Sequence, residues 1–371
     1  MICIIPKVFI VCTGVGHVNR GYESFTIECF ENLKNTKEFE LILLKGAGRE
    51  SENQIQIPCV KRNSTTGTLL SKLLKKERYW LEQLTFFFGM LPALIRYKPS
   101  VIYYSDFILG TFLWQLRRIF KFKYKLIFCN GAPNGPPFKT EDHVQQLLPL
   151  YVSQGLLGGE NLLKMTILPY AINIDKNKLP LSVNEIKTLK LKLGLPTDKR
   201  IIISIGAVNN FHKRMDYIVD EFSLISNNDF FLLILGQIDE KSDEIINQAE
   251  NKLPKNSYLI MQVNNSEVIQ YLSVSDYFIL ASLSEGLPRV LPEALGSGLL
   301  PIVHDYKVTR ETLQEFGIFK NMTQKGILLE SINEVNKRNV SKATIIDFAY
   351  QKYSWDKLTP KYEELICKNI I

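Results

Sequence analysis

Residues 282–305 read SLSEGLPRVLPEALGSGLLPIVHD, and this stretch decides how the second half of the chain folds. It begins where the apolar run DYFILAS (276–282) ends, and a run of this length and composition predicts a buried strand. A helical stretch over about 288–296 follows, and then a second apolar run, LLPIVHD (299–305). Strand, helix and strand in this order predict two parallel strands joined by a crossover helix.

The same alternation continues on both sides of this stretch. Further strands of the second half are predicted at RIIISIG (200–206), DFFLLILG (229–236) and SYLIMQV (257–263), with helices at about 214–226, 241–252 and 266–273. The first half repeats the pattern, with a crossover helix between Arg20 and Leu33 and strands at KVFIVC (7–12), FELILLK (39–45), SVIYYS (100–105) and KLIFCN (125–130). We therefore predict an α/β protein with two parallel, doubly wound sheets.

The length of the chain and an interruption of the strand–helix pattern predict two domains. A chain of 371 residues is long for one hydrophobic core. Prolines and polar residues interrupt the pattern at MTILPYAINIDKNKLP (165–180). We predict Rossmann-like domains at 1–170 and 171–350, and a closing helix at 351–371 that returns to the first domain. Two such domains are expected to bind ligands in a cleft at the carboxyl ends of their strands.

Composition narrows the class of protein. Hydrophobic residues make up 46% and charged residues 22% of the chain, which is typical of a globular protein and excludes disorder. The six cysteines are scattered without metal-ligand spacing, which favours a reduced cytoplasmic protein. No apolar run is long enough for a transmembrane helix, and the apolar start lacks the cleavage site of a signal peptide.

The net charge of +7 permits anionic partners. Basic and aromatic residues interleave in two segments of the first half, 71–98 and 114–125. Each segment alone is most simply a solvated helix face over a core. Two of them in one half also suggest a peripheral surface for anionic lipid head groups.

The turn at 285–288 carries the first candidate site. Pro288 is suited to the first position of a helix, and the backbone amides of Gly286 and Leu287 would then favour a diphosphate. Glu285 and Glu293 would repel a phosphate, so we expect them to bind neutral hydroxyl groups of a sugar or ribose. Taken singly, Glu285 is as well explained by helix capping and Glu293 by an exposed helix position.

The order of residues from 285 to 303, E-G-L-P-x-x-L-x-E-A-L-x-x-G-x-x-P-I-V, closely resembles the E-x7-E region of retaining glycosyltransferase family 4. This family, the glycosyl transferases group 1, has the GT-B fold. Other segments resemble family motifs in the required order: ILPYAIN (167–173), GAVNNFHKRMDYIVDEFSLI (206–225), LLILG (232–236), VIQYLSVSDYFILAS (268–282) and YSWDKLTPKYEELI (353–366).

The resemblance implies a hexosyltransferase-type enzyme that uses a UDP- or GDP-sugar, with no metal and no resident cofactor. Glu293 would hold the ribose, Glu285 the donor sugar, and Lys213 the diphosphate. Arg214 would take the place of an arginine that many relatives carry nearer to Gly206, although it is equally a candidate surface residue. The remaining donor-binding positions are Gly14, Gly16, Gly206, Gly236, Gly286, Leu287, Pro288 and Val263.

The first half is expected to bind the acceptor, a carbohydrate, a lipid-linked saccharide or a small molecule. Asp106 follows the strand VIYYS and is placed either to orient the acceptor hydroxyl or to cap a helix. His143, in DHVQQLLP (142–149), is more often a helix-surface histidine than a catalyst. We keep it with Arg20 as an acceptor candidate, and we take Glu285, Asp106 and His17 as candidate catalytic residues.

The loop TGVGHVNRGYESF (13–25) resembles a dinucleotide loop only in part. The fingerprint G-x-G-x-x-G needs a glycine where Asn19 stands, so a nicotinamide cofactor is excluded. We expect Gly14 and Gly16 to let the backbone approach the donor. His17 is either a site residue or a solvent-facing histidine of a tight turn.

Three alternatives stay open at this point. The first is a nucleotide-sugar epimerase or an inverting GT-B transferase, because some inverting members resemble G-x-G-H at His17 and use such a histidine as a base. A nucleic-acid-binding protein would need clustered cations with stacking aromatics, which the second half lacks. A non-catalytic member of the family is disfavoured because Glu285 and Glu293 are both present.

Overall fold

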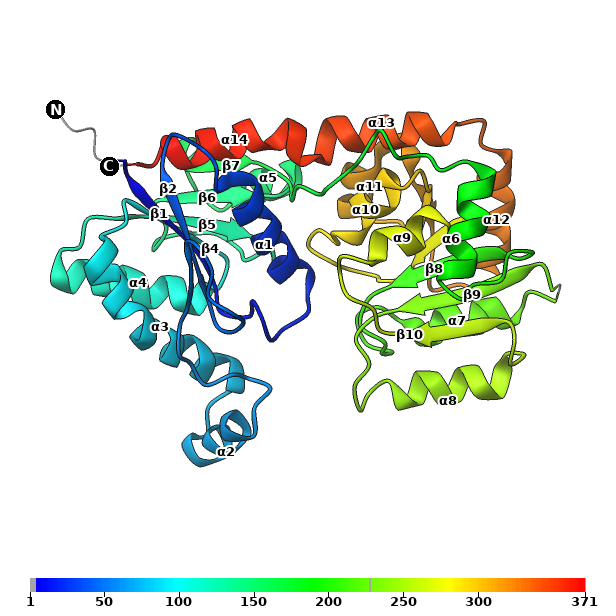
Figure 1. Cartoon of the computed structure of the whole chain (residues 1–371), viewed down its shortest axis with the longest axis horizontal. Helices are drawn as coiled ribbons and strands as arrows, with labels where there is room; N and C mark the ends of the chain where they lie inside the picture. Colours follow the sequence, from blue (N-terminus) through cyan, green and yellow to red (C-terminus); the bar gives the residue numbers. More distant parts are fainter. Residues whose placement is uncertain (1–4, 227, 371) are drawn as a thin grey trace. The chain divides into compact units, whose positions relative to one another are not determined.

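The structure, a computed structural model, describes residues 5–226 and 228–370 in two compact units (Figure 1). Unit 1 comprises residues 1–171 together with 355–371, and unit 2 comprises residues 172–354. The boundaries predicted at 170/171 and 350/351 fall beside these divisions. The chain therefore passes from unit 1 into unit 2 and returns.

Unit 1 is built on a seven-stranded sheet with the order β3-β2-β1-β4-β5-β6-β7, and every pairing in it is parallel. The strands are β1 (Lys7–Cys12), β2 (Glu40–Lys45), β3 (Gln54–Gln56), β4 (Val101–Tyr104), β5 (Lys125–Asn130), β6 (His143–Gln146) and β7 (Met165–Ile167). The four strands predicted from apolar runs are confirmed. The other three were missed because they are short and contain polar residues.

Helices connect these strands: α1 (Gly21–Leu33), α2 (Thr65–Leu74), α3 (Arg78–Tyr97), α4 (Phe107–Phe120) and α5 (Pro149–Leu157). The predicted closing helix is α14 (Trp355–Cys367), and it packs on α1 in unit 1. The Trp355 ring stacks on Phe25, with ring centroids 5.9 Å apart, and the Tyr362 hydroxyl donates to the Pro169 carbonyl at 2.8 Å. These buried contacts explain why the C-terminal helix belongs to the first unit.

Unit 2 contains a six-stranded parallel sheet with the order β10-β9-β8-β11-β12-β13. Its strands are β8 (Arg200–Ile205), β9 (Phe230–Leu235), β10 (Tyr258–Met261), β11 (Tyr277–Leu280), β12 (Pro301–His304) and β13 (Ile318–Lys320). The helices are α6 (Val183–Lys192), α7 (Met215–Ser223), α8 (Asp243–Lys252), α9 (Val268–Ser273), α10 (Val290–Gly296), α11 (Lys307–Leu313), α12 (Ile327–Lys337) and α13 (Lys342–Tyr353).

Two local predictions are wrong. Helix α10 begins at Val290, so Pro288 lies in the turn before the helix rather than at its first position. His143 opens the strand β6, whereas a helix was expected there, because Val144 and the two glutamines after it are buried in the sheet.

Both sheets reverse their strand order next to the first strand of each unit. In unit 1, β2 and β3 follow on one side of β1, and the chain then continues with β4 on the other side of β1. In unit 2, β9 and β10 lie on one side of β8, and β11 lies on the other side. Ligands of doubly wound sheets bind outside the carboxyl ends of the strands at such a switch point. The loops after β1, β4, β8 and β11 are therefore the places to look for a site. Within the described ranges, no helix is long and apolar enough to cross a bilayer.

Candidate active site

An ion pair occupies the switch point of unit 2. Lys213 lies between β8 and α7, and Glu285 lies in the loop after β11. The Lys213 Nζ atom donates to both carboxylate oxygens of Glu285, at 2.6 and 2.7 Å, although the two residues are 72 positions apart. Their side chains are only 18% and 17% exposed. The two residues singled out for diphosphate and sugar thus meet at one half-buried point.

Two glycines make room for this lysine. A Cβ atom at Gly206, whose φ is +155°, would lie 2.7 Å from the Lys213 side chain. A Cβ atom at Gly236 would overlap the Gly206 carbonyl oxygen. Both glycines follow their strands directly, so the ends of β8 and β9 approach more closely than side chains would allow. Packing around Lys213 therefore explains why glycine stands at both positions.

The second glutamate of the E-x7-E pattern lies in the first turn of α10. Glu293 forms a salt bridge with the buried Arg289, whose Nε atom is 3.2 Å from the Glu293 Oε1 atom. Gly286 is half-buried in the turn, whereas the Leu287 and Pro288 side chains are buried. The carboxylate of Glu293 therefore has a fixed cationic neighbour, which sequence reasoning missed.

Two other predicted donor positions have structural roles in unit 2. Arg214 donates from Nη1 to the Met322 carbonyl at 2.7 Å and stacks on the Tyr217 ring at 4.6 Å. It thereby ties the start of α7 to the segment after β13. Val263 lies in the loop after β10 and packs against the core of the unit.

Asp106 lies at the switch point of unit 1, directly after β4. It accepts a hydrogen bond from the Tyr79 hydroxyl at 2.6 Å and one from Thr13 Oγ1 at 3.3 Å. It is buried, and although it precedes α4 its side chain makes no capping hydrogen bond, so helix capping does not explain it. Burial raises the pKa of Asp106, and the hydrogen bond from Tyr79 offsets this only in part.

His17 lies after β1 and is held by a buried carboxylate. Its Nε2 atom is 2.7 Å from the Oε1 atom of Glu82, which is fully buried in α3. Arg62 donates from its backbone N–H to Glu82 Oε1 at 2.9 Å and from its Nε atom to Oε2 at 2.6 Å. Burial opposes ionisation of Glu82, but the hydrogen bonds from His17 and Arg62 outweigh it and lower its pKa.

The ionised Glu82 orients the histidine. A carboxylate can only accept, so the Nε2 atom of His17 carries a proton and donates it to Glu82. Nδ1 is buried and has no hydrogen-bond partner within the described part of the chain. The His17 side chain is 9% exposed, so the interpretation as a solvent-facing histidine is wrong. Glu82 thus holds the ring through Nε2, and Nδ1 is the ring atom left for a further partner.

The glycines of the first loop are required by packing within unit 1. A Cβ atom at Gly14 would overlap the Glu23 carboxylate. At Gly16, where φ is +91°, a Cβ atom would overlap the Ala47 carbonyl oxygen. Arg20 is half-exposed, precedes α1 and pairs with Glu23.

Sequence analysis missed the residues that complete this network. Arg62, Tyr79, Glu82 and Gln83 come from α3 and the segment before α2, and Gln83 Nε2 donates to Thr13 Oγ1 at 2.7 Å. One signal was available: in YWLEQL (79–84) the two adjacent polar residues Glu82 and Gln83 stand among aromatic and aliphatic residues. Buried polar residues in such a position need partners.

His143 lies outside this network. It stands at the amino end of β6, where its Nε2 atom is 2.8 Å from Thr166 Oγ1. The predicted site residues of the unit lie at the carboxyl ends of the strands. We therefore leave His143 out of the proposed site.

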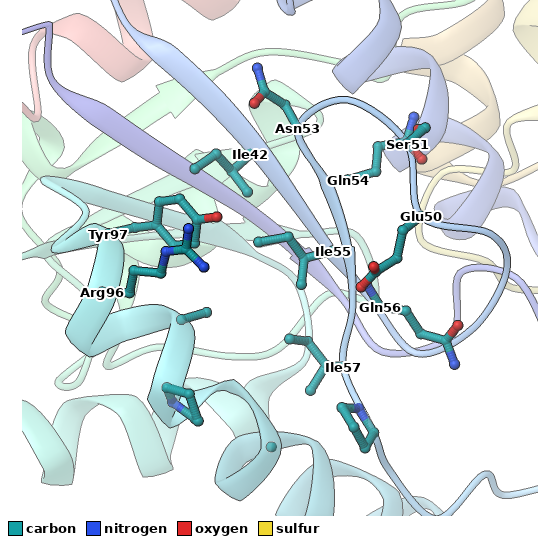
Figure 2. Close-up of a pocket in the computed structure, with 14 residues that line it drawn as sticks. Ile42, Glu50, Ser51, Asn53, Gln54, Ile55, Gln56, Ile57, Arg96 and Tyr97 are labelled. Atoms are coloured by element: carbon teal, nitrogen blue, oxygen red, sulfur yellow. The ribbon is translucent and has the colours of Figure 1, made fainter.

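A separate cavity lies on the flank of unit 1 and contains none of the predicted site residues. Figure 2 shows it between the edge strand β3 and α3, with Ile42, Ile55 and Ile57 near Arg96 and Tyr97. Its volume is about 450 Å³. Within residues 5–226 and 228–370, no three His, Cys, Asp or Glu side chains form a group suited to a metal ion.

Comparison with known proteins finds a family model that matches most of unit 2. Residues 185–351 match the model of the glycosyl transferases group 1. A glycogen synthase of Thermosipho melanesiensis is 26% identical over 211 residues, which cover 53% of this chain and 43% of that protein. The chain thus spans less than half the length of this curated relative.

Solved structures with the same two-unit architecture cover nearly the whole chain. The sucrose-phosphate synthase of Thermosynechococcus elongatus superposes with a TM-score of 0.78 at 13% identity, over 98% of both chains. Anabaena HepE, solved in complex with UDP and glucose, gives a TM-score of 0.74 at 12% identity, over 98% of this chain and 100% of HepE. At these identities the likeness establishes the fold, and the GT-B prediction is confirmed.

Proposed function

We propose that this chain, whose second unit is a domain of the glycosyl transferases group 1 within a GT-B fold, is a glycosyltransferase that moves a sugar from a nucleoside diphosphate to a hydroxyl acceptor. The observation that carries the proposal is the Lys213–Glu285 pair at the switch point of unit 2. A cation there stabilises a departing diphosphate, and a carboxylate beside it binds the hydroxyl groups of the attached sugar.

The proposed reaction retains the configuration of the sugar. The bond between C1 and the diphosphate oxygen breaks, and C1 forms a bond to the acceptor oxygen on the same face. The acceptor proton passes to the departing diphosphate. Lys213 and the backbone N–H groups of Gly286 and Leu287 neutralise the charge that develops on the leaving group, and Glu293 binds the ribose.

We propose a UDP-sugar as the donor, with UDP-glucose to be tested first. The support is indirect: HepE was solved with UDP and glucose, and a matched relative is a glycogen synthase. Because Lys213 and backbone amides supply positive charge, the proposed reaction needs no divalent metal, and EDTA is expected to leave it unchanged. We place it at the cytoplasmic face of a membrane, as a peripheral protein.

The acceptor is proposed to bind at the switch point of unit 1. The buried Nδ1 atom of His17 accepts a hydrogen bond from the acceptor hydroxyl, and Asp106 with Tyr79 and Thr13 forms the adjacent polar wall. A carbohydrate hydroxyl, free or attached to a carrier, suits these groups.

The same histidine supports a second candidate, an inverting transferase. In that reaction His17 removes the acceptor proton through Nδ1, and Glu82 stabilises the resulting imidazolium. The anomer of the product distinguishes the two mechanisms. A product with inverted configuration would replace the retaining proposal.

A thermal-shift panel tests the donor site directly. UDP, GDP and their glucose derivatives are added to the wild type, Lys213→Ala and the matched control Lys252→Ala, whose lysine pairs with Asp220 on the surface. At about 100 Kd a ligand stabilises by about 2.7 kcal/mol, which raises Tm by about 5 °C or more. We expect this shift in the wild type and the control only. No response to any nucleotide would contradict the proposed function.

A further inference from the structure

Helix α2 of unit 1 leaves an apolar stripe uncovered. Of its ten residues, Thr65–Leu74, only Gly67 is buried. Leu69, Leu73 and Leu74 are 68%, 73% and 52% exposed. Figure 1 shows α2 beyond the start of α3, away from the sheet of its unit. The helix thus has little contact with the core that normally receives such leucines.

The exposed leucines lie on one side of the helix. Leu69 and Leu73 are four residues apart, as are Leu70 and Leu74, so the four form a continuous stripe. In a surface helix of a globular protein this stripe faces the core. The helix is nevertheless properly capped, because Ser64 Oγ accepts from the Gly67 N–H at 3.0 Å and Lys75 ends it in a left-handed conformation.

Cations surround the stripe. Residues 69–80, which we name the α2 corner, contain the exposed cations Lys72, Lys75, Lys76 and Arg78 and one exposed carboxylate, Glu77. The Lys76 ammonium lies 5.4 Å from the centre of the Trp80 ring. Leucines on one side of a helix, lysines in it and directly after it, and an aromatic residue at the start of the next helix together have the composition of an interfacial membrane surface.

We propose that the α2 corner docks on an anionic phospholipid surface, with Leu69, Leu73 and Leu74 inserted among the lipids and the lysines on the head groups. A protein partner is disfavoured because lysine is depleted from protein interfaces. An anionic leaflet, in contrast, attracts each lysine electrostatically while it receives the leucines. This inference specifies the surface behind the peripheral location proposed above, and it does not depend on the transfer reaction.

Helix α2 lies between two residues of the candidate acceptor site. Arg62, which holds Glu82, precedes α2 by three positions, and Tyr79, which holds Asp106, lies within the corner itself. The Arg62 guanidinium also stacks on the Tyr79 ring at 4.7 Å. Docking therefore keeps the His17 and Asp106 network close to the head groups.

Vesicle co-sedimentation of the full chain, without nucleotide, tests the proposal. Vesicles of phosphatidylcholine alone are compared with vesicles in which the anionic phosphatidylglycerol replaces part of the phosphatidylcholine. We expect at least about tenfold tighter binding to the anionic vesicles, weakened by salt. Equal binding to both vesicle types, or no binding to either, would overturn the proposal.

Variants identify the surface. Leu69→Gln/Leu73→Gln/Leu74→Gln and Lys72→Gln/Lys75→Gln/Lys76→Gln are each expected to lose at least about tenfold in vesicle binding. The matched control Leu157→Gln/Leu163→Gln removes leucines that are 89% and 86% exposed elsewhere on unit 1, and it is expected to bind like the wild type. Because all these side chains are exposed, the variants should keep the wild-type Tm.

Two further outcomes count against the proposal. Equal loss in the control would show that general surface hydrophobicity drives binding. A dimer in analytical ultracentrifugation that the leucine variant abolishes would show that a second copy covers the stripe. Nucleotide thermal shifts are measured on the same variants and should persist, so a failure of membrane docking is distinguishable from a failure of the proposed donor site.

Discussion

The switch points of the two units follow one plan but are assembled differently. In unit 2, the residues after the first and fourth strands, Lys213 and Glu285, contact each other directly. In unit 1, the corresponding residues, His17 and Asp106, each bind a side chain from α3 instead. The site of unit 2 is closed by two motif residues that pair with each other, whereas the loop residues of unit 1 depend on partners from α3.

This difference explains why unit 2 was the easier site to predict. Its functional residues lie within recognisable motifs, so the spacing along the chain identifies them. In unit 1 the loop residues are visible in the sequence, but Glu82 and Tyr79 acquire their roles only when α3 packs beside β1 and β4. The following predictions test whether the two sites differ in this way.

The largest expected effect is on the stability of unit 1. Glu82→Ala leaves Arg62 and His17 without their buried carboxylate partner, and losses of this kind destabilise by about 3–5 kcal/mol. Chemical denaturation should show this loss. The matched variant Glu285→Ala, whose carboxylate is half-buried, should lose much less stability. Similar losses in both variants would remove the distinction between the two sites.

Lys213→Ala tests catalysis in unit 2. Because the lysine faces the proposed leaving group, we expect transfer from UDP-glucose to fall by about 10²–10³-fold. The control Lys252→Ala should retain activity, since exposed pairs contribute about 0–1 kcal/mol. Steady-state rates and Tm are measured together. Normal turnover by Lys213→Ala would contradict the assigned role of this lysine.

Gly206→Ala tests the packing beneath the lysine. The added Cβ atom would lie 2.7 Å from the Lys213 side chain at a strained φ of +155°. Overpacking of this kind costs about 1–3 kcal/mol. We expect a weaker nucleotide thermal shift as well as a lower Tm. An unchanged thermal shift would show that the position of the Lys213 stem is unimportant.

The lowered pKa of Glu82 predicts a dependence of stability on pH. A carboxylate whose pKa is lower in the folded state stabilises the protein above its unfolded value, near 4.3, and this contribution is lost as the pH falls through the folded pKa. The wild type should therefore exceed Glu82→Gln in free energy of unfolding at pH 7, with a difference that shrinks in acid. A constant difference from pH 7 to pH 3 would contradict the assignment.

The smallest expected effect is a gain in stability. Burial raises the pKa of Asp106, so its charged form disfavours folding as the pH rises above about 3.9, the unfolded value. Asp106→Asn removes this charge and should match or exceed the wild-type stability at pH 7 by about 1 kcal/mol or less. Transfer should fall at the same time. A large loss of stability would show that the carboxylate is structural.

The order of residues alone was enough to predict the parallel α/β architecture, nine of the strands, the resemblance of unit 2 to the glycosyl transferases group 1 and the Lys213 and Glu285 candidates. These depend on local periodicity and on short motifs, which the order of residues records directly. Four features needed the folded chain: Glu82 orients His17, Arg214 binds backbone carbonyls, His143 lies at the opposite edge of its sheet, and the α2 leucines are uncovered. Partners distant along the chain and the burial of a side chain arise from packing, because the same residue is polar surface or site depending on what folds against it.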